Sequence, residues 1–158
     1  MSRQIGTGIP VEYKGREQTY VKHFFLRHYL EKVAYKTLST YDSFVYVDGF
    51  SGPWKSAGEG FSDTSFGIAL EKLRQVKAGW KERKRDVNLK CVFVEKKRES
   101  CRELEAVAIR YPDLDILIIQ GKFEESIQQI LRFVERGFCF LFVDPTNWAV
   151  DTKKSASC

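Results

Sequence analysis

Phe44-Val45-Tyr46-Val47-Asp48-Gly49-Phe50-Ser51-Gly52-Pro53-Trp54 is the stretch that decides the fold class of this chain. Its apolar run, Phe44 to Val47, is typical of a short strand that is covered on both faces, and an acidic, glycine-rich turn follows it. The run from Phe138 to Val143 predicts a second buried strand, which leads into Asp144-Pro145-Thr146-Asn147-Trp148. Ligands of open α/β sheets bind beyond the carboxyl ends of strands, so the two strand ends indicate opposite walls of one site.

Amphipathic segments alternate with the predicted strands. Apolar residues recur at three- and four-residue spacing over 16–37, which predicts a leading helix. Further helices are predicted over 65–76, 99–110 and 124–135, and strands over 44–47, 89–94, 115–119 and 138–143. The basic stretch after residue 76 is expected to be a linker. This alternation implies right-handed parallel crossovers and a doubly wound α/β sheet.

The length of 158 residues is that of one ordinary domain, and 43% hydrophobic residues provide ample material for a core. We therefore expect one domain over 1–158, with the leading helix, a cofactor-binding core over 43–148 and a polar tail over 149–158. No stretch approaches the roughly 20 apolar residues of a membrane span, and the first residues lack the apolar region of a secretory signal. A cytoplasmic location is expected.

The four cysteines show no CxxC spacing. Cys91 and Cys139 fall in apolar strand patterns, which predicts that both are buried as small hydrophobic residues. The only imidazoles, His23 and His28, lie on the predicted leading helix, so few ligands remain for a zinc centre. We predict no metal site.

The formal net charge is +5, and part of the excess is local. Lys81, Arg83, Lys84 and Arg85 form a basic cluster of the kind that attracts nucleic acid. Because acidic residues are interspersed, a solvated helix end explains the same pattern equally well, and both interpretations stay open.

The turn Asp48-Gly49-Phe50-Ser51-Gly52 offers an acid, a tight bend and close backbone approach. It is not GxGxxG, and no GxxxxGK(S/T) motif is present, so it suits a zwitterionic ligand better than a pyrophosphate. Glu95 ends the second predicted strand, where an acid can accept hydrogen bonds from both ribose hydroxyls of a nucleoside. An ordinary solvated carboxylate among neighbouring lysines is the alternative for Glu95.

The turn after the fourth predicted strand combines an acceptor, Asp144, with the rigid Pro145 and the aromatic Trp148. Such groups can hydrogen-bond an exocyclic amino group and stack on a planar base. Packing of Trp148 into the core is the alternative for that residue.

At these positions the chain resembles the S-adenosylmethionine-dependent methyltransferases, and more narrowly it is similar to the three-Cys-motif partner protein family. The similarity covers essentially the whole chain. It is carried by Lys22-His23 to Tyr29-Leu30, Tyr46 to Pro53, Phe93 to Lys96 and Phe142 to Pro145. The resemblance implies a Rossmann-like sheet with strand order 3-2-1-4 and S-adenosylmethionine as cofactor.

The resemblance also implies roles for individual residues. Cofactor-binding positions would be Lys22, Asp48, Gly49, Phe50, Gly52, Glu95 and Phe123. Asp48 and the glycines would surround the methionine part, Glu95 would hold the ribose, and Phe123 would lie near the adenine. Lys22 would reach the cofactor carboxylate, although a solvated helix lysine is the alternative.

Asp144-Pro145 is similar to the Asp-Pro-Pro-aromatic motif of methyltransferases that act on adenine amino groups, and it implies catalytic roles for Asp144, Pro145 and Trp148. Thr146 replaces the second proline, and the aromatic comes one place late. The family also implies association with a radical-SAM-like three-Cys-motif protein.

Methyltransferases of this fold use seven strands, whereas four are predicted here. The fourth would then be an exposed edge, as in a truncated product or one that a partner completes.

Two functions remain. The first is a methyltransferase that acts on an amino group in nucleic acid or in another polar acceptor. The second is a non-catalytic module that binds nucleic acid or protein. The glycine pattern disfavours a nucleotide-dependent oxidoreductase.

Overall fold

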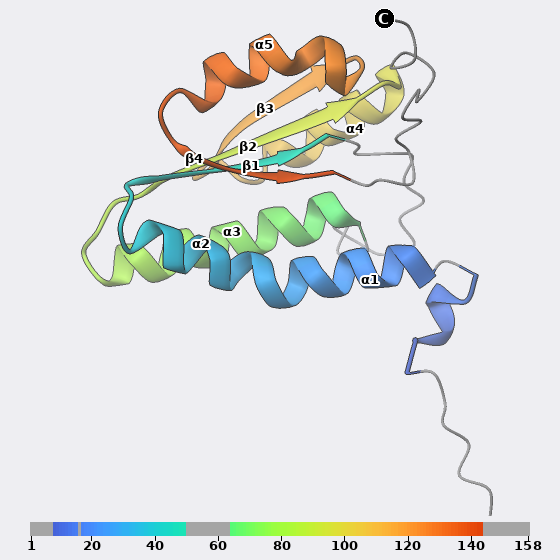
Figure 1. Ribbon diagram of the computed structural model, residues 1–158, viewed down its shortest axis with the longest axis horizontal. Coiled ribbons are helices and arrows are strands. Elements are labelled where there is room, and N and C mark those ends of the chain that lie inside the picture. The colour runs from blue at the N-terminus through green and yellow to red at the C-terminus, as the bar shows by residue number, and fades with distance from the viewer. Residues whose placement is uncertain (1–7, 16, 50–63, 144–158) are drawn as a thin grey trace, which may run out of the picture.

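A computed structural model describes residues 8–15, 17–49 and 64–143 of the chain (Figure 1). Its strands are β1 (Ser43–Asp48), β2 (Asn88–Glu95), β3 (Asp115–Gln120) and β4 (Phe138–Phe142). They form one sheet in the order β3-β2-β1-β4, and every neighbouring pair is parallel. The predicted doubly wound α/β class and the order 3-2-1-4 are confirmed.

Helices precede β1 and connect the strands. They are α1 (Glu17–Phe25), the π-helical segment η2 (Leu26–Leu30), α2 (Glu31–Leu38), α3 (Ser65–Glu82), α4 (Arg98–Ala108) and α5 (Phe123–Val134), after a short 3-10 turn, η1 (Val11–Tyr13). The leading helix predicted from the sequence is thus a continuous helical stretch with a π turn inside it.

The expectation of a linker directly after residue 76 is wrong, because α3 continues to Glu82. Leu73, Val76 and Trp80 follow one another at three- and four-residue spacing, and all three are buried. The apolar stripe of the helix therefore extends through the basic stretch. Lysines between the stripe positions are good helix formers and leave the helix uninterrupted.

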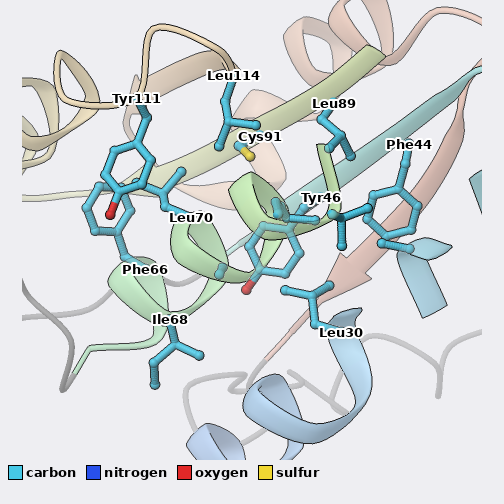
Figure 2. Packing of buried hydrophobic residues seen from close by; sticks show 14 of the residues in the cluster. Leu30, Phe44, Tyr46, Phe66, Ile68, Leu70, Leu89, Cys91, Tyr111 and Leu114 are labelled. Atoms are coloured by element: carbon cyan, nitrogen blue, oxygen red, sulfur yellow. The ribbon is translucent and has the colours of Figure 1, made fainter. Parts of the chain in front are cut away.

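One face of the sheet holds most of the core. Tyr46 of β1 is in register with Cys91 of β2, so side chains at alternate positions of both strands point to the same face. The leading helix, α3 and α4 cover that face, and Phe44 and Tyr46 pack there against Leu30 (Figure 2). Cys91 is fully buried, as predicted.

The opposite face is covered by α5, which lies alone on its side of the sheet in Figure 1 among the described helices. Ile130 and Val134 of α5 pack on the valines of β1 and β2. Beyond this helix the edge strand β4 is partly open: Cys139 is exposed and Leu141 is 49% exposed. The prediction that Cys139 and the fourth strand are buried is wrong, because α5 does not extend over β4. Within the described residues β4 is an edge strand, as expected.

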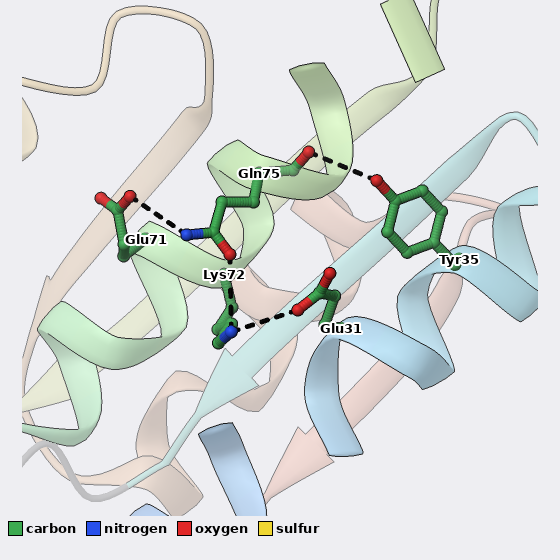
Figure 3. Close-up of polar contacts among 5 residues, drawn as sticks. All are labelled: Glu31, Tyr35, Glu71, Lys72 and Gln75. Carbon is green, nitrogen blue, oxygen red and sulfur yellow. Dashed lines mark hydrogen bonds and ion pairs between the residues drawn. The ribbon is translucent and has the colours of Figure 1, made fainter. Parts of the chain in front are cut away.

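Polar contacts hold the leading helix against α3 (Figure 3). Lys72 Nζ lies 3.1 Å from Glu31 Oε2, and the Tyr35 hydroxyl donates to the Gln75 carbonyl at 3.5 Å. A side chain at Gly79 would collide with the Tyr35 hydroxyl, so the absence of a side chain there permits the close approach. In the described part of the chain, no helix has the length and apolar character required to cross a membrane.

Candidate functional site at the carboxyl edge of the sheet

Asp48 and Glu95 end adjacent strands at the same edge of the sheet. Asp48 is in register with Phe93, so Glu95 lies two residues further along β2 and on the same face as Asp48. Both acids are buried, with exposed fractions of 0% and 5%. The structure thus brings together the two carboxylates that the sequence assigned to one ligand.

The start of α3 lies beside Asp48. Thr64 caps this helix by accepting a hydrogen bond from Gly67 N at 3.0 Å, and Ser65 Oγ donates to Asp48 Oδ2 at 3.4 Å. The partial positive charge of a helix N-terminus stabilises a nearby carboxylate. Sequence reasoning missed Ser65, whose only signal was a hydroxyl at the first position of a predicted helix.

Tyr46 lies on the same face of β1 as Asp48, one side-chain repeat earlier. Its hydroxyl is buried and has no hydrogen bond of good geometry among the described residues. Burial raises the Tyr46 pKa well above its usual value, and the nearby negative charge of Asp48 raises it further. The phenol therefore remains protonated at neutral pH. Sequence reasoning treated Tyr46 only as a strand residue.

The turn between β2 and α4 orients Glu95. Its Oε1 accepts a hydrogen bond from Lys97 N at 2.8 Å, and its carbonyl accepts from Gly121 N at 2.9 Å. Within the described residues, Oε2 accepts no hydrogen bond. The Cys101 thiol also contacts the Glu95 carbonyl, and burial, followed by the Glu95 charge, raises the Cys101 pKa. A carboxylate held by one oxygen can accept hydroxyl donors with the other.

Gly49 and Phe123 meet at the same edge. A Cβ on Gly49 would lie 2.9 Å from Cδ2 of Phe123, so the ring at the start of α5 rests on bare backbone. Gly49 N donates to the Phe142 carbonyl at 3.2 Å, which joins the end of β1 to that of β4. The close approach predicted for this glycine is thus made, in this structure, by an aromatic ring.

Lys22 of α1 belongs to the same edge. Its Nζ lies 5.1 Å from the centroid of the Phe142 ring, and Phe142 is in register with Asp48. Five of the predicted cofactor-binding residues are therefore found at the carboxyl ends of the strands or beside them: Asp48, Gly49 and Glu95 at the ends of β1 and β2, Phe123 at the start of α5, and Lys22 in the last turn of α1.

The remaining predicted site residues lie outside the described residues. They are Phe50 and Gly52 of the first turn, and Asp144, Pro145 and Trp148 of the second. Their predicted roles stay predictions.

The basic cluster of Lys81, Arg83, Lys84 and Arg85 lies where α3 ends, on the side of the amino ends of the strands. Arg85 forms an ion pair with Asp42 at 2.8 Å, and its guanidinium lies 5.0 Å from the Trp80 ring. Arg83 also lies over Trp80, at 5.2 Å. Lys81 and Lys84 are exposed. Arg83 and Arg85 thus contribute to local packing, which fits the interpretation of this cluster as a solvated helix end.

The cavities lined by described residues include the following two. One of about 290 Å³ lies at the amino ends of β1, β2 and β4, beside Lys90 and Gly137, and one of about 240 Å³ lies between α4 and β3. Neither is lined by Asp48 or Glu95. The described residues contain no group of three or more His, Cys, Asp or Glu side chains that could hold a metal ion.

No protein-family model, no curated protein and no solved structure matches this chain.

Proposed function

We propose that this chain binds S-adenosylmethionine at the carboxyl edge of its sheet and acts as a methyltransferase of the three-Cys-motif partner type. The observation that carries the proposal is the pair of buried carboxylates, Asp48 and Glu95, on one face at the ends of adjacent parallel strands. This edge is where ligands of open α/β sheets bind. Ionised carboxylates accept hydrogen bonds at several lone pairs, so both acids can also receive donors from a ligand at this edge.

In this proposal Glu95 accepts hydrogen bonds from the ribose hydroxyls through the oxygen that Lys97 N does not occupy. Asp48 attracts the ammonium group of the methionine part, and Lys22 attracts its carboxylate. The Phe123 ring offers an apolar surface beside the adenine. These assignments place one positive, two negative and one aromatic group around a zwitterionic nucleoside.

The cofactor supplies an electrophilic methyl group on sulfur. The protein then has to hold an acceptor nitrogen in line with that methyl, which is mainly a matter of positioning. Asp144 would accept a hydrogen bond from the acceptor amino group, and Pro145 and Trp148 would fix and stack the ring that carries it. The proposed acceptor is an amino group in nucleic acid.

A non-catalytic binding module is the second candidate. The partly open strand β4, with Leu141 49% exposed, favours it, because such an edge can pair with another chain. A radical-SAM-like three-Cys-motif protein is the partner that the family resemblance suggests.

Calorimetric titration with S-adenosylhomocysteine tests the first proposal. We expect the wild-type chain to bind, and Glu95→Gln to weaken binding by about tenfold to a hundredfold, since charge-assisted hydrogen bonds contribute about 1.5–3 kcal/mol. Asp48→Asn should weaken it similarly. Glu99→Gln, an exposed carboxylate at the start of α4, is the matched control and should bind like the wild type. Absence of heat at millimolar ligand, or equal binding by Glu95→Gln, would contradict the proposal.

A further inference from the structure

The solvent-facing side of the leading helix carries exposed apolar and aromatic side chains, followed by two lysines. We call this surface the ring face; its members are Val21, Phe24, Phe25, His28, Tyr29, Lys32 and Lys36. Four of them are large apolar side chains with exposed fractions of 36% to 63%: Val21, Phe24, Phe25 and Tyr29. A helix that only covers a core exposes polar residues instead. Packing of the leading helix on the core therefore does not explain why these apolar side chains are exposed.

The rings of this face are arranged in contacting pairs. Phe25 and Tyr29 stack with centroids 5.1 Å apart and an interplanar angle of 22°. The Phe24 ring lies 4.2 Å from the imidazole of His28. Three of these residues lie in or next to the π-helical segment η2, and π turns inside helices occur frequently at functional sites.

The ring face is continuous with the carboxyl edge of the sheet. Phe25 stacks at 6.4 Å on Phe140 and at 6.3 Å on Phe142 of β4. Lys22, one turn before Phe25, lies over the same Phe142 ring. A polymer lying along the helix would therefore reach the edge that holds Asp48.

The charge of this surface is positive. Lys32 Nζ lies 6.0 Å from the Tyr29 ring, and Lys36 is exposed one turn further on. The two acids of the described leading helix are engaged elsewhere. Glu31 pairs with Lys72 of α3 (Figure 3), and Glu17 accepts a hydrogen bond from Gly15 N.

We infer that the ring face binds single-stranded nucleic acid. Unpaired bases stack on exposed aromatic rings, and phosphates are attracted by lysines beside them, which is how single strands are bound without sequence preference. A duplex keeps its base faces stacked inside and offers nothing to Phe24 or Tyr29. Lys32 lies beside the Tyr29 ring and Lys36 is exposed one turn further on, and this positive charge favours a polyanion such as nucleic acid.

This inference rests on the proposed function in one respect: the bound single strand would be the methyl acceptor. Binding to the ring face requires no cofactor and is measured without it. A failure of the S-adenosylhomocysteine titration and a failure of nucleic-acid binding are therefore separate results.

The test is fluorescence anisotropy of the full chain with a labelled single strand of about 12 nucleotides, in RNA and DNA form, and with a duplex of the same length. Tyr29→Ala and Phe24→Ala should each weaken single-strand binding about tenfold, as expected for loss of a stacked base. Lys32→Glu should weaken it and lower the salt slope by about 0.7 or more. Lys81→Glu, an identical charge change in the basic cluster, should alter binding less than the ring-face variants. Thermal melts check that each variant is folded.

Single-strand binding that the ring variants and Lys32→Glu reduce selectively would support the inference. It is overturned if the wild type binds no single strand at low salt, or if it binds the duplex equally well. It is also overturned if Lys81→Glu causes the larger loss of single-strand affinity, which would place binding at the basic cluster at the end of α3. Self-association that Tyr29→Ala abolishes, in the absence of nucleic-acid binding, would instead identify the ring face as a protein interface.

Discussion

Charged side chains are compensated differently at the amino ends and at the carboxyl ends of the strands, which we call the amino edge and the carboxyl edge of the sheet. At the amino edge, opposite side-chain charges neutralise one another: Arg85 pairs with Asp42 at 2.8 Å, and Lys90 pairs with Glu135 at 3.6 Å. At the carboxyl edge, the buried Glu95 is oriented by a backbone N–H instead, at 2.8 Å. A dipolar donor orients a carboxylate and leaves its negative charge in place, whereas a cation neutralises it.

This difference distinguishes the cavity at the amino edge from the candidate binding site at the carboxyl edge. The amino edge holds the larger of the two cavities described, about 290 Å³, but the polar groups around it are used to hold the fold together. At the carboxyl edge, Asp48, Glu95 and the Phe123 ring lie near Gly49. A Cβ at Gly49 would approach the Phe123 ring too closely. We therefore expect changes at the carboxyl edge to alter ligand binding, and changes at the amino edge to alter stability alone.

Gly49→Ala should produce the largest effect. Its new Cβ would press on the Phe123 ring, and overpacking of this kind destabilises a protein by about 1–3 kcal/mol. We expect a lower free energy of unfolding in urea and weaker binding of S-adenosylhomocysteine, because the ring beside the predicted adenine site must move. Gly8→Ala, where a Cβ meets nothing within 4 Å, is the control. An unchanged free energy of unfolding for Gly49→Ala would show that the ring yields without strain.

Lys90→Met should have a smaller effect, and only on stability. Lys90 is 8% exposed and donates to the Phe133 carbonyl at 3.0 Å, so the substitution removes one buried hydrogen bond and one ion pair. We expect a loss of about 0.5–1.5 kcal/mol in the free energy of unfolding, the usual net contribution of one hydrogen bond, because the similar volume of Met preserves the packing. Binding of S-adenosylhomocysteine should be unaltered. Impaired binding of S-adenosylhomocysteine by this variant would contradict the proposal that the amino edge affects stability alone.

Tyr46→Phe should have the smallest effect at neutral pH. The hydroxyl it removes is buried without a hydrogen bond of good geometry among the described residues, so its loss costs little or even stabilises the fold.

The same variant should matter at alkaline pH. Burial and the Asp48 charge raise the folded pKa of Tyr46 above the usual 10.0, so the unfolded chain loses its phenol proton first. The contribution of Tyr46 to stability is therefore complete below about pH 10 and is lost as the pH rises through its folded pKa. Urea unfolding across this range should show a shallower decline for Tyr46→Phe. Parallel curves for the two proteins would mean that Tyr46 contributes nothing to the alkaline loss.

Much of the carboxyl edge could be predicted from the sequence, because parallel strands end together. The apolar run before Asp48 and the one before Glu95 were enough to place both acids at one edge. That they share a face depends on the register between Tyr46 and Cys91, which no local pattern encodes. The contact of Phe123 with Gly49 likewise depends on how α5 crosses the sheet.

The exposure of β4 was not predictable from its residues. Cys139 lies in an apolar run like that of Cys91, and yet one thiol is exposed and the other is buried. The difference comes from which face each side chain points to. Cys91 points to the face that the leading helix, α3 and α4 cover, whereas Cys139 is in register with Val45 and points to the face of α5, which leaves β4 open. The ring face was missed for a related reason: a three- and four-residue apolar pattern predicts a helix but does not say which aromatic residues stay in solvent.

Mapping S-adenosylhomocysteine by backbone amide NMR tests the central claim most directly. We expect the largest shifts on the amides of Gly49, Lys97 and Gly121, which lie at the ends of β1, β2 and β3. Shifts concentrated instead on Asn88 and Gly137, beside the cavity at the amino edge, would contradict it.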